Sequence, residues 1–425
     1  MSIASPSSHA ASSRPALKPL DTALAELLAQ AAPLSGVETV STFDADHRVL
    51  AQDLVSSLDV PAHDNSAMDG YAVRCTDLAA GTLLQVTQRI PAGSTGHALK
   101  PQSAARIFTG APIPPGADAV VMQEDCEIVE TLEAGGASAA GVRIKALPAP
   151  GQWIRRRGED VASGAVVLRQ GQRLTPAELG LAASIGFDKL VVTSPVRVAL
   201  FSTGDELVMP GEVPPSQMKP GAIYNSNRFF LRALLQRLGC VVTDLGIVPD
   251  QRQATIAALQ GASQHHDLIL TSGGVSVGEE DHIKPAVQAL GELNLWQIAM
   301  KPGKPFAYGQ VGSAHFIGLP GNPVSSLVTF LLLVRPFLLK LQGVDQVAIN
   351  SIAIRADFTW ARADKRREFL RVRRNAAGGL DLFSNQSSGV LTSAVWGDGL
   401  VDNPAGQTIA PGDTVQFIPF SALLS

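Results

Sequence analysis

A buried-strand pattern that stops at two glycines is the feature that most constrains this chain. Residues 268–281 read LILTSGGVSVGEED, an apolar run followed by Gly273 and Gly274 and then by acidic residues that open a predicted helix. Glycine accepts backbone conformations that other residues avoid, and a helix that begins after such a turn offers unpaired N–H groups. The pattern predicts an α/β fold in which the backbone comes close to an anionic ligand.

The same alternation of strand and helix patterns extends on both sides of that turn. Strand patterns lie at 196–201, 240–248, 268–274, 295–300 and 315–321, and helix patterns lie at 227–239, at 253–262, after Asp281 and from Pro323. This order predicts a doubly wound, mainly parallel sheet with right-handed crossovers, in which all strands end at one edge. Ligands of such sheets bind beyond the carboxyl ends of the strands, so this edge is the predicted crevice.

Polar and glycine residues that follow these strands fall together at the crevice by topology. They are Glu206, Asp250, Gly273, Gly274, Asp281, Lys301, Lys304 and Asn322. Two lysines in the stiff KPGKP loop suit phosphate or another oxyanion. Carboxylates on neighbouring strand ends repel one another unless a hard divalent cation lies between them, and Mg²⁺ meets that need. Taken singly, such an acid is more often a turn or helix cap, and such a lysine a solvated surface charge.

The rest of the chain has different sequence patterns. Residues 1–18 are rich in Ser, Ala and Pro and are expected to form a disordered leader rather than a signal peptide. A helix is predicted over 21–32 with Asp21 as a candidate N-cap, and a second helix starts at a Thr175 cap and stops at Gly186. Short β-type runs between 55 and 147 indicate a compact all-β module.

Composition excludes several classes of protein. The 425 residues suggest roughly three domains. The net charge of −4 gives no reason to expect nucleic acid or an anionic membrane as a partner. The longest apolar run, 327–334, is well short of the ~20 residues that span a bilayer. Three widely separated cysteines favour reduced thiols in a cytoplasm.

Seven motifs, in order, resemble the molybdopterin molybdenumtransferases, the MoeA family, to which the C-terminal domain of gephyrin also belongs. They cover nearly the whole chain after about Pro19, and they are DVPAHDNSAMDGYAVR (59–74), RIFTGAPIPPGADAVVMQED (106–125), IRRRGEDV (154–161), ALFSTGDEL (199–207), TSGGVSVGEED (271–281), MKPGKPFAYG (300–309) and GLPGNPVSS (318–326).

The resemblance implies four domains. These are an extended domain from two segments (19–54 and 148–194), an inserted β-domain (55–147), an α/β molybdopterin-binding domain (195–342) and a C-terminal β-barrel (343–425). β-like runs after Gly343 fit a small barrel. Family members are elongated homodimers whose cleft joins the α/β and C-terminal domains of one subunit to the β-domain of the other. Asp69 and Thr109 would then face the site across the interface, although a plain turn role for DNSAMDG is the alternative.

The implied reaction is insertion of molybdenum from molybdate into adenylylated molybdopterin, with Mg²⁺-dependent release of AMP. The resemblance assigns catalysis to Asp281, Asp250, Glu206, Asp69 and Thr109, and the first three would also bind Mg²⁺. The substrate and molybdate would contact Lys301, Lys304, Gly273, Gly274, Pro320, Asn322, Pro323, Ser325, Arg371 and Ser388. Arg371 and Ser388 belong to the REFLR and QSSGVLTS runs, and as isolated residues they would more often be surface polar groups. Further implied partners are a molybdopterin adenylyltransferase and acceptor molybdoenzymes.

Three positions depart from the family pattern. Gln297 stands where a lysine is expected from some relatives, His282 replaces a usual tyrosine, and Asn225 replaces a usual aspartate. Two alternatives stay open: a molybdopterin adenylyltransferase, which uses a related α/β domain, and a noncatalytic scaffold.

Overall fold

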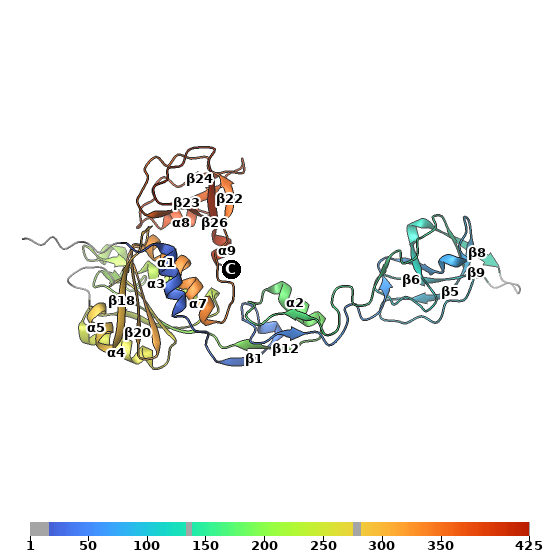
Figure 1. Cartoon of the computed structure of the whole chain (residues 1–425), viewed down its shortest axis with the longest axis horizontal. Coiled ribbons are helices and arrows are strands. Elements are labelled where there is room, and N and C mark those ends of the chain that lie inside the picture. Colours follow the sequence, from blue (N-terminus) through green and yellow to red (C-terminus); the bar gives the residue numbers. More distant parts are fainter. Residues whose placement is uncertain (1–16, 133–137, 275–281, 425) are drawn as a thin grey trace, which may run out of the picture.

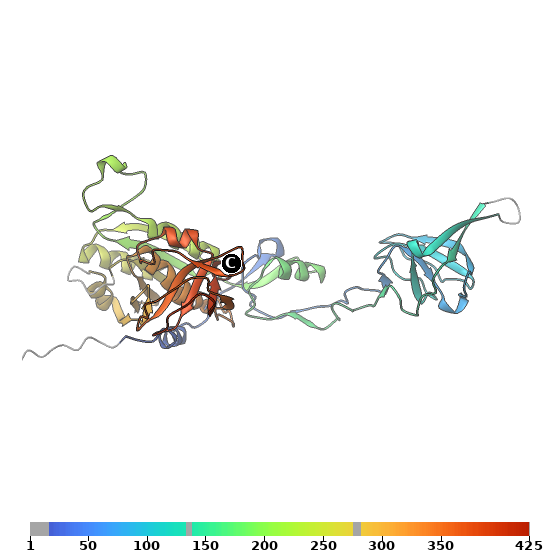
Figure 2. The same cartoon turned by 90° about the horizontal axis from the view of Figure 1, so that it is seen from above.

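The protein is elongated. The structure is a computed structural model that describes residues 17–132, 138–274 and 282–424. Most of the predicted leader, residues 1–16, lies outside these ranges, as does Asp281. Figures 1 and 2 show an α/β unit and the C-terminal strands at one end of the molecule, a β-domain at the other end, and a narrow connection between them.

A six-stranded mixed sheet forms the centre of the α/β unit. Its strands run in the order β16 (Val241–Val248), β13 (Arg197–Thr203), β17 (Leu268–Ser272), β21 (Ala314–Leu319), β20 (Pro305–Val311) and β18 (Gly291–Gln297). Parallel pairing joins β16, β13, β17 and β21, whereas β20 is antiparallel to both of its neighbours.

The expectation that all strands end at one edge is therefore wrong for β20, which the strand patterns also missed. Only residues 298–304 connect β18 to β20, and this segment is too short for the crossover that a parallel pair requires. The predicted strand at 295–300 is also divided. β18 ends at Gln297, and Met300–Lys301 form a separate strand, β19, which pairs with the C-terminal domain. Lys301 and Lys304 nevertheless lie at the predicted edge, because β18 runs in the same direction as β17.

Helices cover both faces of this sheet, as the doubly wound prediction requires. One face packs on α3 (Ser226–Arg237) and the other on α4 (Arg252–Ser263) and α5 (Ile283–Leu290). Successive strand residues point to opposite faces, so Leu200 and Leu270 join the α3 side while Ala199 and Ile269 join the α4–α5 side.

A long apolar helix and α1 (Leu20–Ala29) pack with α3 on the same face of the sheet. The long helix consists of α6 (Pro323–Thr329), a π-helical turn (Phe330–Val334) and α7 (Arg335–Leu341). Its length and hydropathy would allow it to cross a membrane, but 89% of the apolar window is buried inside the protein. A helix that is apolar all round must be buried, and here the protein core buries it. Asp21 is not the N-cap of α1, because Pro19 holds that position and Asp21 pairs with Arg367 (2.9 Å).

Two separate chain segments form the narrow connection. They pair as β1 (Val37–Ser41) with β12 (Lys189–Thr193), β2 (Leu54–Val55) with β11 (Val166–Leu168), and β3 (Asn65–Ser66) with β10 (Ile154–Arg155). The short η1 helix (Thr42–Asp44) packs against α2 (Pro176–Ser184). As predicted, Thr175 caps α2 through a capping box with Glu178, and Gly186 follows its end in a left-handed conformation (φ +89°).

The distal β-domain is one six-stranded sheet. Its order is β7 (Ala119–Met122), β4 (Gly70–Val73), β6 (Ser103–Ile107), β5 (Leu83–Ile90), β9 (Ser138–Ile144) and β8 (Cys126–Leu132), with η2 (Cys75–Asp77) and η3 (Gln123–Asp125) in its connections. The predicted β-type runs in this part of the chain are strands.

The C-terminal strands form an open path of pairings. The order is β19 (Met300–Lys301), β23 (Arg367–Arg374), β25 (Gly399–Asn403), β26 (Thr414–Pro419) and β22 (Ile352–Arg355), with β24 (Leu380–Leu382) beside β23. Within the described part of the chain no pairing joins β19 to β22, so the predicted closed barrel is not confirmed. Two short helices, α8 (Thr392–Trp396) and α9 (Phe420–Leu424), complete this domain. Because β19 comes from the β18–β20 connection, the C-terminal domain is bound directly to the edge of the α/β sheet.

Candidate functional site

The double-glycine turn follows β17 at the carboxyl edge of the central sheet. Gly273 and Gly274 have φ values of +94° and +65°, which disfavour other residues. A Cβ atom on Gly273 would lie 2.9 Å from the Thr203 carbonyl oxygen, and one on Gly274 would lie 2.6 Å from Ile283 Cδ1. The Gly273 N–H donates to the Leu319 carbonyl (3.0 Å). These two positions therefore require glycine, and the turn is bonded to the strand that leads into the next Gly-rich loop.

Asn227, which sequence reasoning missed, joins two of the predicted loops. Its buried amide group, on α3, donates to Ser272 Oγ (2.9 Å) and to the Gly321 carbonyl (2.7 Å). Since Ser272 precedes the double glycine and Gly321 lies in GLPGNP, one side chain fixes the spacing of both loops. The available signal was its place in the first turn of a predicted helix.

The GLPGNP loop connects β21 to α6. Pro320 is buried, Asn322 is exposed at the N-cap position of α6, and Pro323 is the first helical residue. Ser325 is buried in the first turn of the helix. This loop therefore places exposed Asn322 at the crevice, while its neighbours anchor it in the core.

Ser388 of the C-terminal domain reaches the same loop. Its carbonyl oxygen accepts a hydrogen bond from the Val324 N–H (2.9 Å), and its side chain is half-buried. The predicted residues of the GLPGNP and QSSGVLTS motifs are thus brought together across the domain boundary.

Arg371 is a buried cation next to this junction. Its side chain on β23 is 1% exposed and donates to Ser393 Oγ (3.1 Å), the Phe369 carbonyl (3.1 Å) and the Ser387 carbonyl (3.3 Å). Burial lowers the pKa of Arg371 to about 10, so the guanidinium stays charged at neutral pH. The alternative of an isolated surface group is therefore wrong for Arg371.

The two lysines of KPGKP have different surroundings. Lys301 Nζ lies 2.9 Å from Glu368 Oε1 and 3.4 Å from Asp364 Oδ2. Glu368 is buried and also accepts a hydrogen bond from Trp360 Nε1 (2.7 Å). Lys304 is exposed and makes no ion pair among the described residues. The loop therefore holds one cation that is offset by carboxylates and a second that faces solvent.

The predicted carboxylates follow neighbouring strands. Glu206 is exposed in the turn after β13, and Asp250 is half-buried just after β16. Their oxygen atoms are hard ligands of the kind Mg²⁺ prefers. Among the described residues no group of three or more His, Cys, Asp or Glu side chains could hold a metal, and the third predicted ligand, Asp281, lies outside those ranges.

Asp69 and Thr109 are brought together on the distal β-domain. Asp69 Oδ1 accepts hydrogen bonds from both the Thr109 N–H and its hydroxyl (2.8 Å each), which lowers the pKa of Asp69. The pair joins two loops that are far apart in sequence. Figures 1 and 2 place this domain at the opposite end of the molecule from the crevice of the same chain.

The three departures from the family pattern have local roles. Asn225 is buried as the N-cap of α3, where its side chain accepts from the Arg228 N–H (3.2 Å). His282 directly precedes α5. Gln297 ends β18, and its carbonyl accepts from the Lys18 N–H (2.7 Å).

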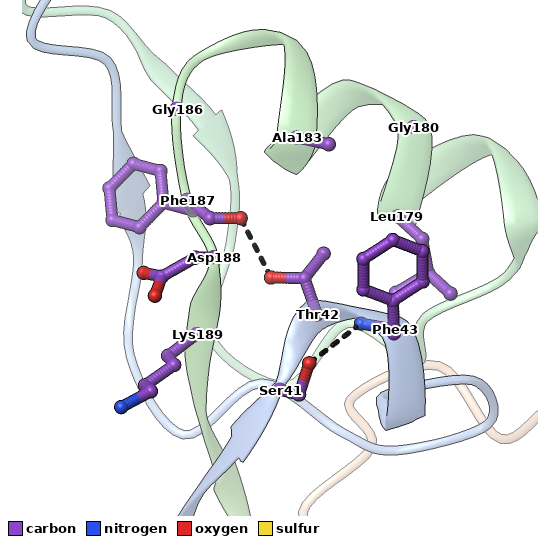
Figure 3. A pocket seen from close by; sticks show the side chains of 10 residues that line it. All are labelled: Ser41, Thr42, Phe43, Leu179, Gly180, Ala183, Gly186, Phe187, Asp188 and Lys189. Carbon is purple, nitrogen blue, oxygen red and sulfur yellow. Dashed lines mark hydrogen bonds between the residues drawn. The ribbon is translucent and has the colours of Figure 1, made fainter.

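An apolar hollow of about 660 Å³ lies away from the crevice, on the narrow connection (Figure 3). Phe43, whose side chain is 97% exposed, stands at its side. The hollow lies between η1 and α2 and is lined by Ser41, Thr42, Phe43, Leu179, Gly180, Ala183, Gly186, Phe187, Asp188 and Lys189. Its apolar lining does not suit a phosphate-bearing ligand.

Comparisons with known proteins cover almost the whole chain. Residues 18–186 match the MoeA N-terminal region (domain I and II), residues 199–340 a probable molybdopterin binding domain, and residues 353–420 the MoeA C-terminal region (domain IV). A molybdopterin molybdenumtransferase of Haemophilus influenzae is 46% identical over 77% of this chain and 78% of that protein. The chain belongs to the MoeA family.

Two other members of the family match a greater share of this chain. A molybdopterin molybdenumtransferase of Synechococcus elongatus is 37% identical over 92% of this chain and 96% of its own. The crystal structure of a MoeA protein of Pyrococcus horikoshii superposes with a TM-score of 0.79 at 27% identity, over 95% of this chain and all of that one. The MoeA architecture thus extends over the full described fold.

Proposed function

We propose that this chain is a molybdopterin molybdenumtransferase that inserts molybdenum from molybdate into adenylylated molybdopterin and releases AMP. The observation that supports this most directly is the convergence of three Gly-rich turns at one sheet edge, where the C-terminal domain is bonded to the KPGKP and GLPGNP segments. Phosphate and pterin groups suit the backbone at Gly273, Gly274 and the GLPGNP loop.

The cations at this edge suit molybdate, a tetrahedral dianion. Lys304 is the exposed charge of the KPGKP loop, whereas the charge of Lys301 is offset by Glu368 and Asp364. Arg371 supplies a fixed guanidinium beneath the segment that contains Ser388. Exposed Asn322 would contact the substrate from the GLPGNP loop, whose shape depends on Pro320, Pro323 and Ser325.

Mg²⁺ fits the hard oxygen ligands of Glu206 and Asp250, and Asp281 would complete the set. When bound, the ion offsets the charge that develops on the phosphoanhydride oxygens as AMP leaves. The chain itself would hold these carboxylates at adjacent strand ends and keep the anionic substrate oriented toward them.

We further propose a homodimer in the cytoplasm. Asp69 and Thr109 lie too far from the crevice of their own chain to reach its ligand, so a second copy would have to supply them (Figure 1). Phe43 and the apolar hollow offer a surface that a second copy could cover. The three cysteines are free thiols, which suits a reducing compartment.

The decisive experiment incubates the purified chain with adenylylated molybdopterin, molybdate and Mg²⁺ and measures AMP release together with molybdenum bound to the pterin. We expect molybdate-dependent release of AMP. Tight substrate binding without release would instead indicate a scaffold, and efficient AMP transfer from ATP to molybdopterin would indicate an adenylyltransferase.

A further inference from the structure

Two arginines lie side by side on the sheet of the distal β-domain. Arg89 on β5 is the register partner of Arg106 on the neighbouring parallel strand β6. Arg106 is also the register partner of Tyr71 on the other side, on β4. Three adjacent strands therefore place two cations and an aromatic ring in one row.

Within the described ranges neither guanidinium forms a direct ion pair, although Arg106 is close enough to Asp69 to help lower the pKa of that carboxyl. Among the residues that the structure describes, no Asp or Glu oxygen lies within 4.0 Å of Arg89 or Arg106. Arg106 donates instead to the Gly70 carbonyl (2.9 Å) and to Gln123 Oε1 (2.6 Å). Like charges on neighbouring strands repel each other, so this arrangement is favourable chiefly when an anion lies between them.

Arg143 on the same sheet shows the ordinary arrangement. It lies on β9 and pairs with Glu127 (2.9 Å), its register partner on β8. An exposed pair of this kind contributes little to stability and needs no ligand. Among the described residues, the lack of a direct ion pair at Arg89 and Arg106 is therefore not a general property of this surface.

Phe108 orients both guanidinium groups. The Cζ atom of Arg89 lies 4.5 Å from the centre of its ring, and the Cζ atom of Arg106 lies 4.7 Å away. Contacts of this length are attractive and restrict long side chains that would otherwise sample many rotamers. The planar guanidinium donors match the oxygen geometry of phosphate, and here two of them are held close together.

The arginines adjoin the two β-domain residues expected at the cleft. Thr109 follows Phe108 directly, and Asp69 precedes Gly70, whose carbonyl holds Arg106. Asp69 is already hydrogen-bonded by Thr109, so its charge is partly satisfied within the domain. The cations therefore lie on the side of the β-domain that the proposed dimer turns toward the substrate.

We infer that Arg89 and Arg106, ordered by Phe108, form an anion site that binds a phosphate group of a nucleotide. The inference rests on the proposed function, in which the nucleotide is the adenylyl part of the substrate and then the AMP product. The β-domain would thereby hold the phosphate end of the ligand while the other domains hold the molybdate.

Calorimetric binding of AMP to the full chain tests this site, with inorganic phosphate as a second probe. Arg89→Ala removes an exposed side chain that makes no hydrogen bond in the described fold, and should weaken AMP and phosphate binding about tenfold. Arg106→Lys keeps the charge but loses the planar fork, and should also weaken both. Arg143→Ala is the matched control and should bind as the wild type does. Unchanged melting temperatures would show that all variants are folded.

Wild-type affinity for AMP in both Arg89→Ala and Arg106→Lys would overturn the inference. Weaker binding of AMP with unchanged binding of phosphate would also overturn it, because the arginines would then recognise another part of the nucleotide. The proposed function is judged separately by molybdate-dependent AMP release from the wild type. If that release occurs while the variants bind normally, only the anion site is refuted.

Discussion

At the scale of single residues, buried polar groups set the geometry of the crevice. Asn227 donates to Ser272 and to the Gly321 carbonyl, so it fixes the distance between two substrate loops. The sequence motifs identified those loops but not the side chain that joins them. Asn227 lies outside the loops in sequence, and its role depends on how α3 packs behind the sheet.

We expect Asn227→Ala to lower both stability and turnover. The change leaves the Ser272 hydroxyl and the Gly321 carbonyl without their partner, which should cost about 1–3 kcal/mol of unfolding free energy. Turnover should fall by more than the loss of folded protein accounts for, because the two loops lose their fixed spacing. Urea denaturation and the AMP-release assay measure the two effects. Asn294→Ala, at an exposed position on β18, is the control, and equal stability of the two variants would contradict this role.

The proposed metal role of Asp250 gives a second residue-scale prediction. Asp250→Asn keeps the size of the side chain but removes the charge that a hard cation needs. The Mg²⁺ concentration for half-maximal AMP release should rise about tenfold or more. An unchanged Mg²⁺ dependence would remove Asp250 from the ligand set.

At the scale of elements, the β18–β20 connection decides how the domains meet. Its residues Met300–Lys301 form β19, which pairs with β23 of the C-terminal domain. The strand patterns predicted five of the six central strands but divided this region wrongly, since a short connection forces an antiparallel pair. Both lysines lie in this connection, but Lys301 is part of β19 and pairs with Glu368, whereas Lys304 is exposed.

Alanine variants of these two lysines should therefore behave differently. Lys304→Ala should raise the molybdate concentration needed for half-maximal rate and leave stability nearly unchanged, because the side chain is exposed. Lys301→Ala should also destabilise the chain by about 1–2 kcal/mol, because buried Glu368 would lose its cation. The loss is smaller than for a fully buried pair, because solvent partly screens the half-exposed lysine. Thermal denaturation and molybdate titrations distinguish them. Equal stability of the two variants would show that the Lys301–Glu368 pair does not hold β19 to β23.

At the scale of the whole molecule, the elongated shape separates residues that one reaction is proposed to use. Asp69 and Thr109 lie on the distal β-domain, and the Gly-rich turns lie at the other end (Figure 2). A complete site then depends on a second copy, and Phe43 beside its apolar hollow is an exposed apolar surface suited to that contact.

Phe43→Ser should shift the chain from dimer toward monomer and lower turnover at low protein concentration. Analytical ultracentrifugation across a concentration series measures the shift. Ile128→Ser, at another exposed apolar residue (71% exposed) on β8, should leave the dimer intact. A Phe43→Ser dimer as tight as the wild type would show that this surface is not the interface.

The sequence by itself determined the elements whose signals are local. Apolar periodicity marked most strands and helices, Thr175 and Gly186 marked the limits of α2, and the positive φ at Gly273 and Gly274 is a property of glycine. Tertiary structure decided what depends on distant neighbours. β20 became a strand by pairing with β18 and β21, Arg371 became buried under the Ser387–Ser388 segment, and Lys301 acquired Glu368 through β19. These contacts join residues remote in sequence, and only the packing of the domains places such residues within hydrogen-bond distance.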